Sequence, residues 1–221
     1  MTPSLPGEGL PRAVEVALCL TVLLLCSPVL IVVAAAVAAT SPGPILFRHR
    51  RIGRRGRPFA MLKFRTMHDG AGGPGVTSKG DARITAIGKI LRKTKLDELP
   101  ELWNVVRGDM SLVGPRPEAV QYVTGSPLWT AVLRVRPGIT DPMTLRLRNE
   151  EELLAAAGAN YEAFYRNQLL PYKLHGYRDY IAGRTWKRDV AVLWLTLLAV
   201  LFPGRVPAPS PGEIASHTEP A

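Results

Sequence analysis

AVEVALCLTVLLLCSPVLIVVAAAVAAT, residues 13–40, is an apolar run in which Glu15 is the only charged residue. The run is long enough for a helix that enters a lipid bilayer. Ser27-Pro28 interrupts its middle, and a proline there removes a helical hydrogen bond and clashes with the preceding turn. The residues alone leave two arrangements open: a bend that returns the chain to the side from which it entered, or one tilted or kinked span.

A dense basic block, RHRRIGRRGR at residues 48–57, follows the apolar run directly. The alanine-rich end of the run, residues 34–39, would also suit a signal-peptide cleavage region. The basic block argues against export, because positive charge beside a membrane segment stays on the cytoplasmic side. We therefore expect the rest of the chain to face the cytoplasm.

Size and charge restrict the class of protein further. The chain has 221 residues, a formal net charge of +10 and a slightly positive mean hydropathy of +0.07. This length suits one catalytic unit, and basic and apolar material in one chain indicates anionic partners at a membrane surface. Both cysteines, Cys19 and Cys26, lie inside the apolar run, so no disulfide framework or cysteine-based zinc site is predicted.

Periodicity beyond the apolar run predicts an α+β fold that is mostly helical. Two short strands within residues 45–67 form a β-hairpin. Residues 84–95 have the spacing of a basic amphipathic helix at the membrane interface, and residues 149–170 of a helix with an acidic first turn. Residues 190–202 fit an interfacial or core-packed helix. We expect four regions: a tail at 1–12, the membrane helix at 13–40, a membrane-associated catalytic domain at 41–202, and a disordered tail at 203–221.

The segment richest in chemical groups is LRKTKLDELPELWNVVRGDMSLVGPRP, residues 91–117. Pro100 fits only the first turn of a helix, which places Asp97 and Glu98 at that helix's N-terminus. The same sequence would result if Asp97 were an ordinary helix cap and Glu98 a first-turn acid favoured by the helix dipole. The functional interpretation comes from the basic helix on one side of the pair and the rigid GPRP element on the other.

Phosphate chemistry requires such a mixture of charges. Cations offset the charge of phosphate oxygens, while a carboxylate binds Mg²⁺ or attacks phosphorus to form an acyl phosphate. Lys63, Arg92 and Arg116 are candidate phosphate contacts, although solvated surface charges would give the same pattern. Arg136, in RVRPGIT at residues 134–140, is a weaker candidate. The sequence has no Walker loop, G-x-G-x-x-G or G-x-S-x-G motif.

Three segments closely resemble the bacterial sugar transferases, which are monotopic polyprenyl-phosphate phosphoglycosyl transferases. They are LKFRTM at 62–67, ITAIGKILRKTKLDELPELWNVVRGDMSLVGPRP at 84–117, and RPGIT at 136–140. The resemblance covers roughly residues 16–198 and is closest to the minimal form of the family. It implies a ping-pong reaction in which an aspartate attacks the β-phosphate of a UDP-sugar and UMP leaves. Polyprenyl (undecaprenyl) phosphate then takes the phosphosugar, as the first membrane step of a bacterial glycan pathway.

The matching motifs also imply residue roles. Asp97 would be the nucleophile, and Glu98 would assist it at a Mg²⁺ site to which both contribute. Lys63, Arg92 and Arg116 would lie around the phosphates. Ser27-Pro28 matches the helix-breaking pair of the family, which implies a re-entrant helix in the bacterial inner membrane with both chain ends in the cytoplasm. The expected partners are a UDP-sugar, polyprenyl phosphate and membrane lipid, with no nucleic acid and a possible homo-oligomer.

Asp141-Pro142 departs from the family pattern, which more often has glycine after RPGIT. A family subgroup continues as this chain does, with RNEEELL at residues 148–154. Two alternatives remain. The chain would be a membrane-tethered basic protein that binds nucleic acid or anionic lipid, or an enzyme in which Glu98 or a water acts as base for direct attack by the lipid phosphate.

Overall fold

A computed structural model describes residues 9–70, 72, 76–77, 80–202 and 209–215. The apolar run forms two helices, α1 (Arg12–Leu25) and α2 (Ser27–Thr40), which meet at Cys26 with a bend of 63°. Pro28 lies in the first turn of α2, where a proline leaves no helical hydrogen bond unmade, and the Ser27 hydroxyl donates to the Leu24 carbonyl at 2.7 Å. The predicted break at Ser27-Pro28 is confirmed.

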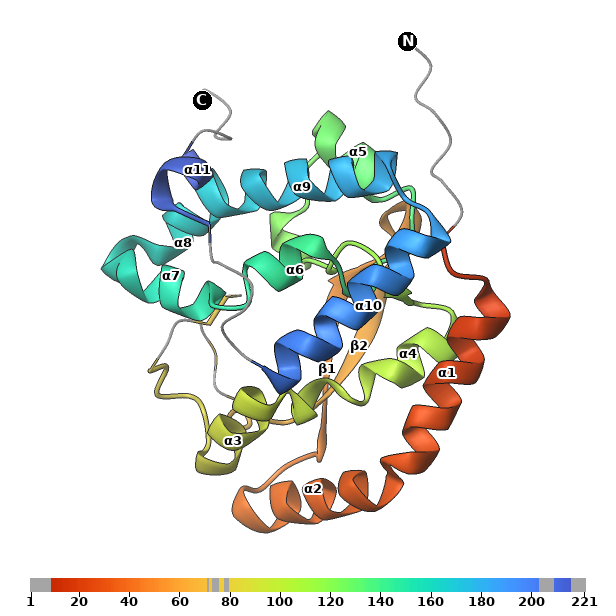
Figure 1. Cartoon of the computed structure of the whole chain (residues 1–221). Coiled ribbons are helices and arrows are strands. Elements are labelled where there is room, and N and C mark those ends of the chain that lie inside the picture. The colour runs from red at the N-terminus through yellow and green to blue at the C-terminus, as the bar shows by residue number, and fades with distance from the viewer. Residues whose placement is uncertain (1–8, 71, 73–75, 78–79, 203–208, 216–221) are drawn as a thin grey trace.

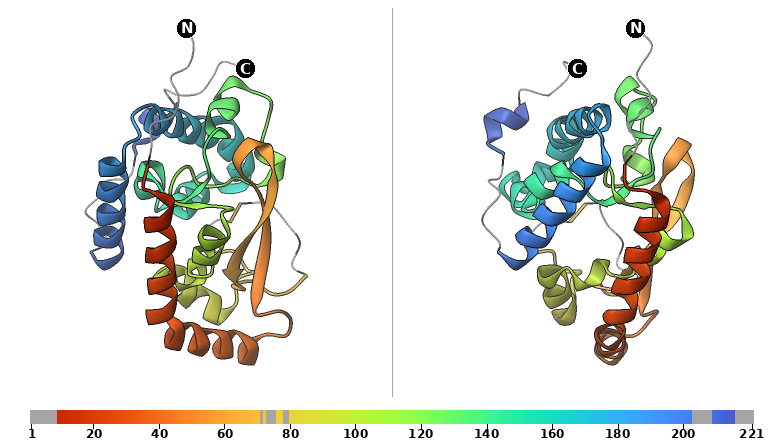
Figure 2. Two further views of the ribbon diagram at one scale, coloured as in Figure 1. Left: turned by 90° about the vertical axis from the view of Figure 1, so that its right-hand side faces the viewer. Right: turned by 45° about the vertical axis from the view of Figure 1, so that its right-hand side comes forward.

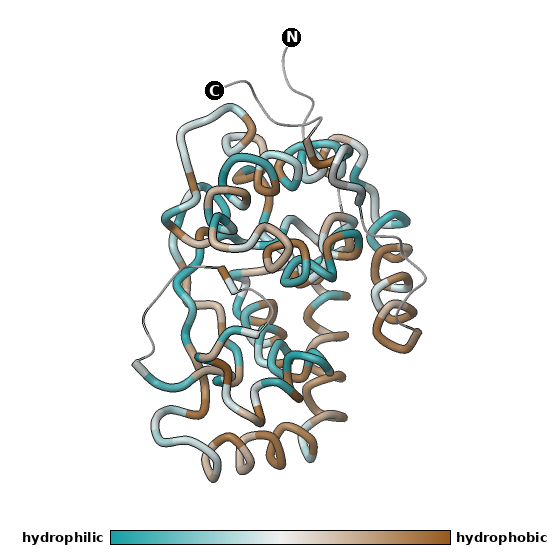
Figure 3. The backbone as a smooth tube through the Cα atoms, turned by 90° about the vertical axis from the view of Figure 1, so that its left-hand side faces the viewer, coloured by the Kyte–Doolittle hydropathy of each residue, from teal (hydrophilic) through white to brown (hydrophobic). Residues whose placement is uncertain are grey.

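The bent pair forms one margin of the molecule, with α1 along its side and α2 turned beneath it (Figures 1 and 2). Among the described residues, no single helix is long and apolar enough to cross a membrane, and α1 and α2 meet that condition only together. Leucine and isoleucine side chains on the pair are strongly exposed, and Figure 3 shows the apolar residues along both helices. A large exposed apolar surface of this kind indicates an interaction surface.

Glu15, the charged residue in the apolar run, is buried and attaches α1 to the rest of the protein. Its carboxylate accepts a hydrogen bond from the Leu112 backbone amide at 2.9 Å and pairs with Arg12 at 3.2 Å. The Arg12 guanidinium also donates to the carbonyls of Val105 and Met110. A buried charge is tolerated only when it is paired and hydrogen-bonded, so these contacts account for an acid in an apolar helix.

The predicted β-hairpin is present. Strand β1 (Leu46–Ile52) pairs antiparallel with β2 (Pro58–Phe64), and Phe47 lies opposite Lys63. A second small sheet, which the sequence did not predict, joins β3 (Ser111–Val113) in parallel to β4 (Gly138–Thr140). The first residue of β4 must be glycine, because a Cβ atom on Gly138 would lie 2.1 Å from the Gly114 backbone nitrogen.

Helices make up most of the remaining fold. Besides α1 and α2 they are α3 (Ala86–Thr94), α4 (Glu101–Arg107), α5 (Pro127–Val132), α6 (Pro142–Arg146), α7 (Glu150–Ala156), α8 (Tyr161–Phe164), α9 (Leu170–Ala182), α10 (Trp186–Leu201) and α11 (Pro211–Ala215). The main core lies between α4, β3, α5 and α9 and includes the buried side chains of Val105, Met110, Trp129, Leu169 and Tyr177. The described part of the chain is therefore mostly helical with small sheets, an α+β fold.

Two expected elements differ from the structure. Residues 149–170 form no continuous helix, because the chain turns at Gly158, which has a positive φ of 62°, and passes through α8 and a π-helical turn before α9. The expected disordered tail contains α11, held by the buried Ile214 and a Glu213–Arg146 ion pair of 2.6 Å. The other residues of the two expected tails, 1–8, 203–208 and 216–221, lie outside the described residues.

Candidate active site

Asp97 and Glu98 occupy one short 3₁₀ turn, Leu96–Glu98, between α3 and α4. Lys95 ends α3 in the left-handed conformation with φ of 59°, and Pro100 stands at the cap position of α4. No side chain caps the N-terminus of α4. The interpretation of Asp97 as an ordinary helix cap is therefore wrong.

The Asp97 side chain is buried in an unusual state for a carboxylate. The residue is 6% exposed, and its Oδ1 atom has no hydrogen-bond partner among the described residues. Burial raises the pKa of Asp97, the positive charge of Lys63 opposes that rise, and the negative charge of Glu98 adds to it. The structure thus holds a buried carboxylate oxygen without a described hydrogen-bond partner, on which the positive charge of Lys63 acts.

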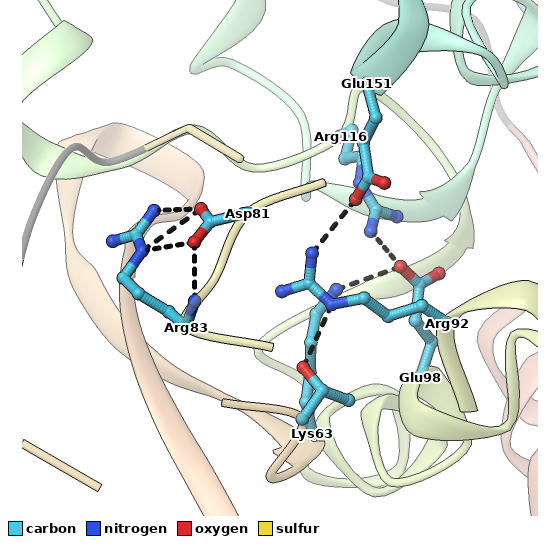
Figure 4. Close-up of polar contacts among 8 residues, drawn as sticks. Lys63, Asp81, Arg83, Arg92, Glu98, Arg116 and Glu151 are labelled. Atoms are coloured by element: carbon cyan, nitrogen blue, oxygen red, sulfur yellow. Dashed lines mark hydrogen bonds and ion pairs between the residues drawn. The ribbon is translucent and has the colours of Figure 1, made fainter. Parts of the chain in front are cut away.

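Glu98 has the opposite surroundings, as Figure 4 shows. Its Oε1 atom accepts hydrogen bonds from Lys63 Nζ at 2.9 Å and from Arg116 Nη2 at 2.5 Å. Burial alone would raise the pKa of Glu98, but Arg116 and Lys63 together hold it well below its usual value. Arg116 is itself fixed by a hydrogen bond from Nη1 to the Ile139 carbonyl in β4, at 3.2 Å.

Arg92 reaches the same region from the last turn of α3. Its Nε atom donates to the Thr66 hydroxyl at 3.0 Å. Its Nη1 atom donates to Glu151 of α7 at 2.9 Å (Figure 4). Its positive charge also acts on Asp97. The structure thus brings Lys63, Arg92 and Arg116 near the two acids, and their role as phosphate contacts stays a prediction.

Arg136 has different neighbours. Burial and the positive charges of Arg12 and Arg54 lower its pKa, and Glu15 opposes them. These neighbours belong to α1 and to the turn of the β-hairpin. A phosphate contact by Arg136 therefore stays a prediction from the sequence, without support from the contacts around Asp97.

Sequence reasoning missed two residues of α4 that face the site. Glu101 is fully buried, and its Oε1 atom lies 3.2 Å from Lys63 Nζ. Asn104, one turn later and equally buried, fastens α4 to β2 by accepting from the Leu62 amide at 2.9 Å and donating to the Ala60 carbonyl at 2.8 Å. The available signal was spacing, because residues three and four positions apart share one face of a helix.

The donor set around Asp97 fits Mg²⁺ when part of the coordination comes from a substrate. Among the described residues, no three histidine, cysteine, aspartate or glutamate side chains gather to hold a metal ion. Mg²⁺ is commonly held by one or two carboxylates together with substrate phosphates. Asp97 and Glu98 offer carboxylates of this kind, and no residue in the described part of the chain hydrogen-bonds Asp97 Oδ1.

The unusual Asp141-Pro142 pair has a local structural role. The buried Asp141 carboxylate caps α6, accepting from the Met143 amide at 2.7 Å and the Thr144 amide at 3.1 Å, while Pro142 occupies the first turn. Aspartate before proline is a favourable start for a helix. The departure from the usual family pattern thus begins a helix.

Fold and site together define a class: an enzyme in which a bent apolar helix pair supports a cluster of acids and bases suited to phosphoryl transfer. A family model described as "Bacterial sugar transferase" matches residues 8–203. The chain therefore belongs to the bacterial sugar transferase family, and the noncatalytic binding protein considered from the sequence does not describe it.

Three relatives show how the similarity extends. A UDP-glucose:undecaprenyl-phosphate glucose-1-phosphate transferase of Caulobacter vibrioides is 38% identical over 213 residues, which cover 89% of this chain and 74% of the relative. A protein of the same name from Xanthomonas campestris pv. campestris is 46% identical, over 79% of this chain and 35% of the relative. A UDP-N-acetylgalactosamine-undecaprenyl-phosphate N-acetylgalactosaminephosphotransferase of Aeromonas hydrophila is 36% identical, over 63% of this chain and 34% of the relative.

Proposed function

We propose that the protein transfers a phosphosugar from a UDP-sugar to polyprenyl (undecaprenyl) phosphate and releases UMP. The names of the relatives support a UDP-sugar donor and an undecaprenyl-phosphate acceptor. The observation that carries the proposal is the buried Asp97, whose Oδ1 atom lacks a hydrogen-bond partner among the described residues, while Lys63, Arg92 and Arg116 stand around the acidic pair.

In the first step, an Asp97 carboxylate oxygen attacks the β-phosphorus of the UDP-sugar. A phosphorus–oxygen bond forms to Asp97, and the bond between the β-phosphorus and the bridging oxygen breaks, so that UMP leaves with that oxygen. Burial favours this attack because a buried carboxylate oxygen without a hydrogen-bond partner among the described residues has little solvation to lose.

The cations bind the phosphate oxygens on which charge accumulates. Lys63 and Arg116 are positioned by Glu98, and Arg92 is anchored at Thr66, which leaves each of them near the reacting region. Bound Mg²⁺, held by Asp97 and Glu98 with the donor pyrophosphate, would supply further positive charge for the leaving UMP.

In the second step, a phosphate oxygen of the lipid acceptor attacks the phosphorus of the aspartyl phosphosugar. The bond to Asp97 breaks, and the carboxylate is restored. A polyprenyl acceptor lies in the bilayer, so we place the bent α1–α2 pair in the membrane as a re-entrant element. The catalytic domain would then lie on the cytoplasmic face of the bacterial inner membrane, at the first membrane step of a glycan pathway.

The test is UMP release by the purified protein with Mg²⁺, polyprenyl phosphate and a panel of UDP-sugars. UDP-glucose and UDP-N-acetylgalactosamine head the panel, because the relatives are named for glucose and N-acetylgalactosamine. We expect release with at least one donor and its loss in Asp97→Asn. Asp81→Asn is the matched control, because Asp81 pairs with Arg83 at 2.6 Å, away from Glu98 (Figure 4). Absence of UMP release with every donor would contradict the proposal.

A further inference from the structure

Glu101 is a buried carboxylate with too few partners for a group that merely supports the fold. It is 0% exposed, and no described residue donates a hydrogen bond to its Oε2 atom. Lys63 Nζ stands 3.2 Å from Oε1, at ion-pair distance, while the hydrogen bond of that ammonium goes to Glu98 at 2.9 Å. A buried carboxylate in this state destabilises a protein relative to a packed apolar side chain.

Lys63 therefore contacts two carboxylates, Glu98 and Glu101, which differ in their other contacts. Glu98 also holds Arg116 and belongs to the proposed metal and substrate site. Glu101 has Lys63 as its ion-pair partner among the described residues. If Glu98 turned to a bound phosphate or metal ion, Lys63 would still have its ion pair with Glu101.

Helix α4 contacts the backbone of β2 as well as the side chain of Lys63. The Asn104 side chain accepts a hydrogen bond from the backbone amide of Leu62, the residue before Lys63 in β2. It also donates to the Ala60 carbonyl. Glu101, one turn earlier on the same helix, reaches the Lys63 side chain itself. The two buried polar residues of α4 thus fix the backbone and the ammonium of one lysine.

We infer that Glu101 is a positioning residue, which holds Lys63 at the phosphate site and acts on the reaction only through Lys63. The inference rests on the proposed function. It assigns a role to a side chain outside the Asp97–Glu98 pair, and it predicts that activity and stability respond to Glu101 in different directions.

The experiment is a double-mutant cycle on kcat/KM for UMP release, with the melting temperature of each variant. Glu101→Leu should lower kcat/KM about 10- to 100-fold, the range typical of a lost hydrogen-bond or ion-pair contact to a charged group. Its melting temperature should stay the same or rise, since a poorly partnered buried charge is removed. Glu101→Gln keeps an oxygen that can accept from Lys63 and should stay within about fivefold of wild type.

The Lys63→Met background decides whether Glu101 acts through Lys63. There, Glu101→Leu should cost less than about twofold more, because the partner of the contact is already absent. Glu118→Leu is the structural control: the buried Glu118 carboxylate pairs with Lys173 at 2.6 Å and also accepts a hydrogen bond from the Tyr165 hydroxyl at 2.6 Å. Because this carboxylate is well partnered, its loss should lower the melting temperature. Glu101→Met replaces Glu101→Leu in the cycle if the leucine variant does not fold.

Three results would overturn the inference: wild-type activity in Glu101→Leu, equal losses in both backgrounds, or a melting temperature that falls together with activity in both Glu101→Leu and Glu101→Gln. Failure of the inference alone leaves wild-type UMP release intact. If the wild-type protein releases no UMP from any donor, the proposed function fails and the inference fails with it.

Discussion

Asp97 and Glu98 are adjacent in the chain, yet their carboxyl groups have opposite electrostatic surroundings. Burial dominates at Asp97 and raises its pKa. At Glu98 the positive side chains of Arg116 and Lys63 outweigh burial and lower its pKa. Such divergence between neighbouring acids is typical of sites where the two have separate roles. In the proposed reaction, Glu98 stays ionised and organises cations, and Asp97 supplies the attacking oxygen.

The first prediction concerns pH. Asp97 attacks only when deprotonated, so kcat/KM should fall as pH falls through its pKa, which lies above the usual aspartate value of 3.8. Lys63→Met should move this acidic limb to higher pH, because the positive charge of Lys63 lowers the pKa of Asp97. The measurement is the pH profile of UMP release for both proteins. An acidic limb that stays in place or moves to lower pH in the variant would contradict this account.

The second prediction concerns Lys95, which has a left-handed backbone with φ of 59° just before the acidic turn. Glycine adopts that conformation without strain, so Lys95→Gly should stabilise the protein by about 0.5–1 kcal/mol. The same change should lower kcat/KM severalfold, because the positive charge of Lys95 acts on both Asp97 and Glu98.

Arg55 provides the control for Lys95, since it also has φ of 59° but lies in the turn of the β-hairpin. Arg55→Gly should give a similar gain in the free energy of unfolding and leave UMP release unchanged. Thermal melts and kcat/KM of the two variants check this pair of expectations. Loss of activity in both variants, or in neither, would show that the Lys95 charge has no specific role.

At the scale of elements, the proposed re-entrant arrangement depends on the 63° bend between α1 and α2. The third prediction is that tags at the N-terminus and after Phe202 are both inaccessible from outside intact cells. Replacing both Ser27 and Pro28 with alanine should straighten the pair, since it removes the Ser27–Leu24 hydrogen bond and restores a backbone donor at position 28. The N-terminal tag should then become accessible. An accessible N-terminal tag on the wild-type protein would instead support a single span.

The elements that the sequence predicted are those with local signals. The break at Ser27-Pro28 follows from proline chemistry, and the β-hairpin follows from alternation around a glycine turn. Strands β3 and β4 are three residues each and pair between residues 111–113 and 138–140. No local pattern specifies that pairing, which depends on the close approach of Gly114 and Gly138.

The same distinction applies to the site. Asp97, Glu98, Lys63, Arg92 and Arg116 were identified from motifs, and the structure brings them together. The motifs did not identify the contact between Glu101 and Lys63, because it joins α4 to β2 across the fold. Residues within one motif can be grouped from sequence, whereas contacts between elements require the packed structure.

At the scale of the whole molecule, apolar side chains on α1, α2 and α10 remain exposed. Trp194 of α10 is 60% exposed, whereas Trp129 of α5 is 3% exposed. Aromatic side chains at a protein surface are favoured where a membrane meets water. We therefore propose that these exposed helices form the side of the protein that faces lipid.

The fourth prediction tests that orientation with single-tryptophan variants in vesicles that contain brominated lipid. Fluorescence of a variant that retains only Trp194 should be quenched, because the side chain contacts lipid. Fluorescence of a variant that retains only Trp129 should change little, because Trp129 is enclosed by the core. Equal quenching of both variants, or quenching of Trp129 alone, would contradict the proposed membrane face.

The central claim is that Asp97 carries the phosphosugar, and intact-protein mass spectrometry tests it most directly. Wild-type protein is incubated with Mg²⁺ and the donor that supports UMP release, without lipid acceptor, and then quenched. The account predicts a mass increase of one phosphosugar, located to the peptide that contains Asp97, with a matching amount of UMP and no adduct in Asp97→Asn. UMP release that requires the lipid acceptor, with no adduct on the protein, would contradict the account and favour direct attack by the lipid phosphate.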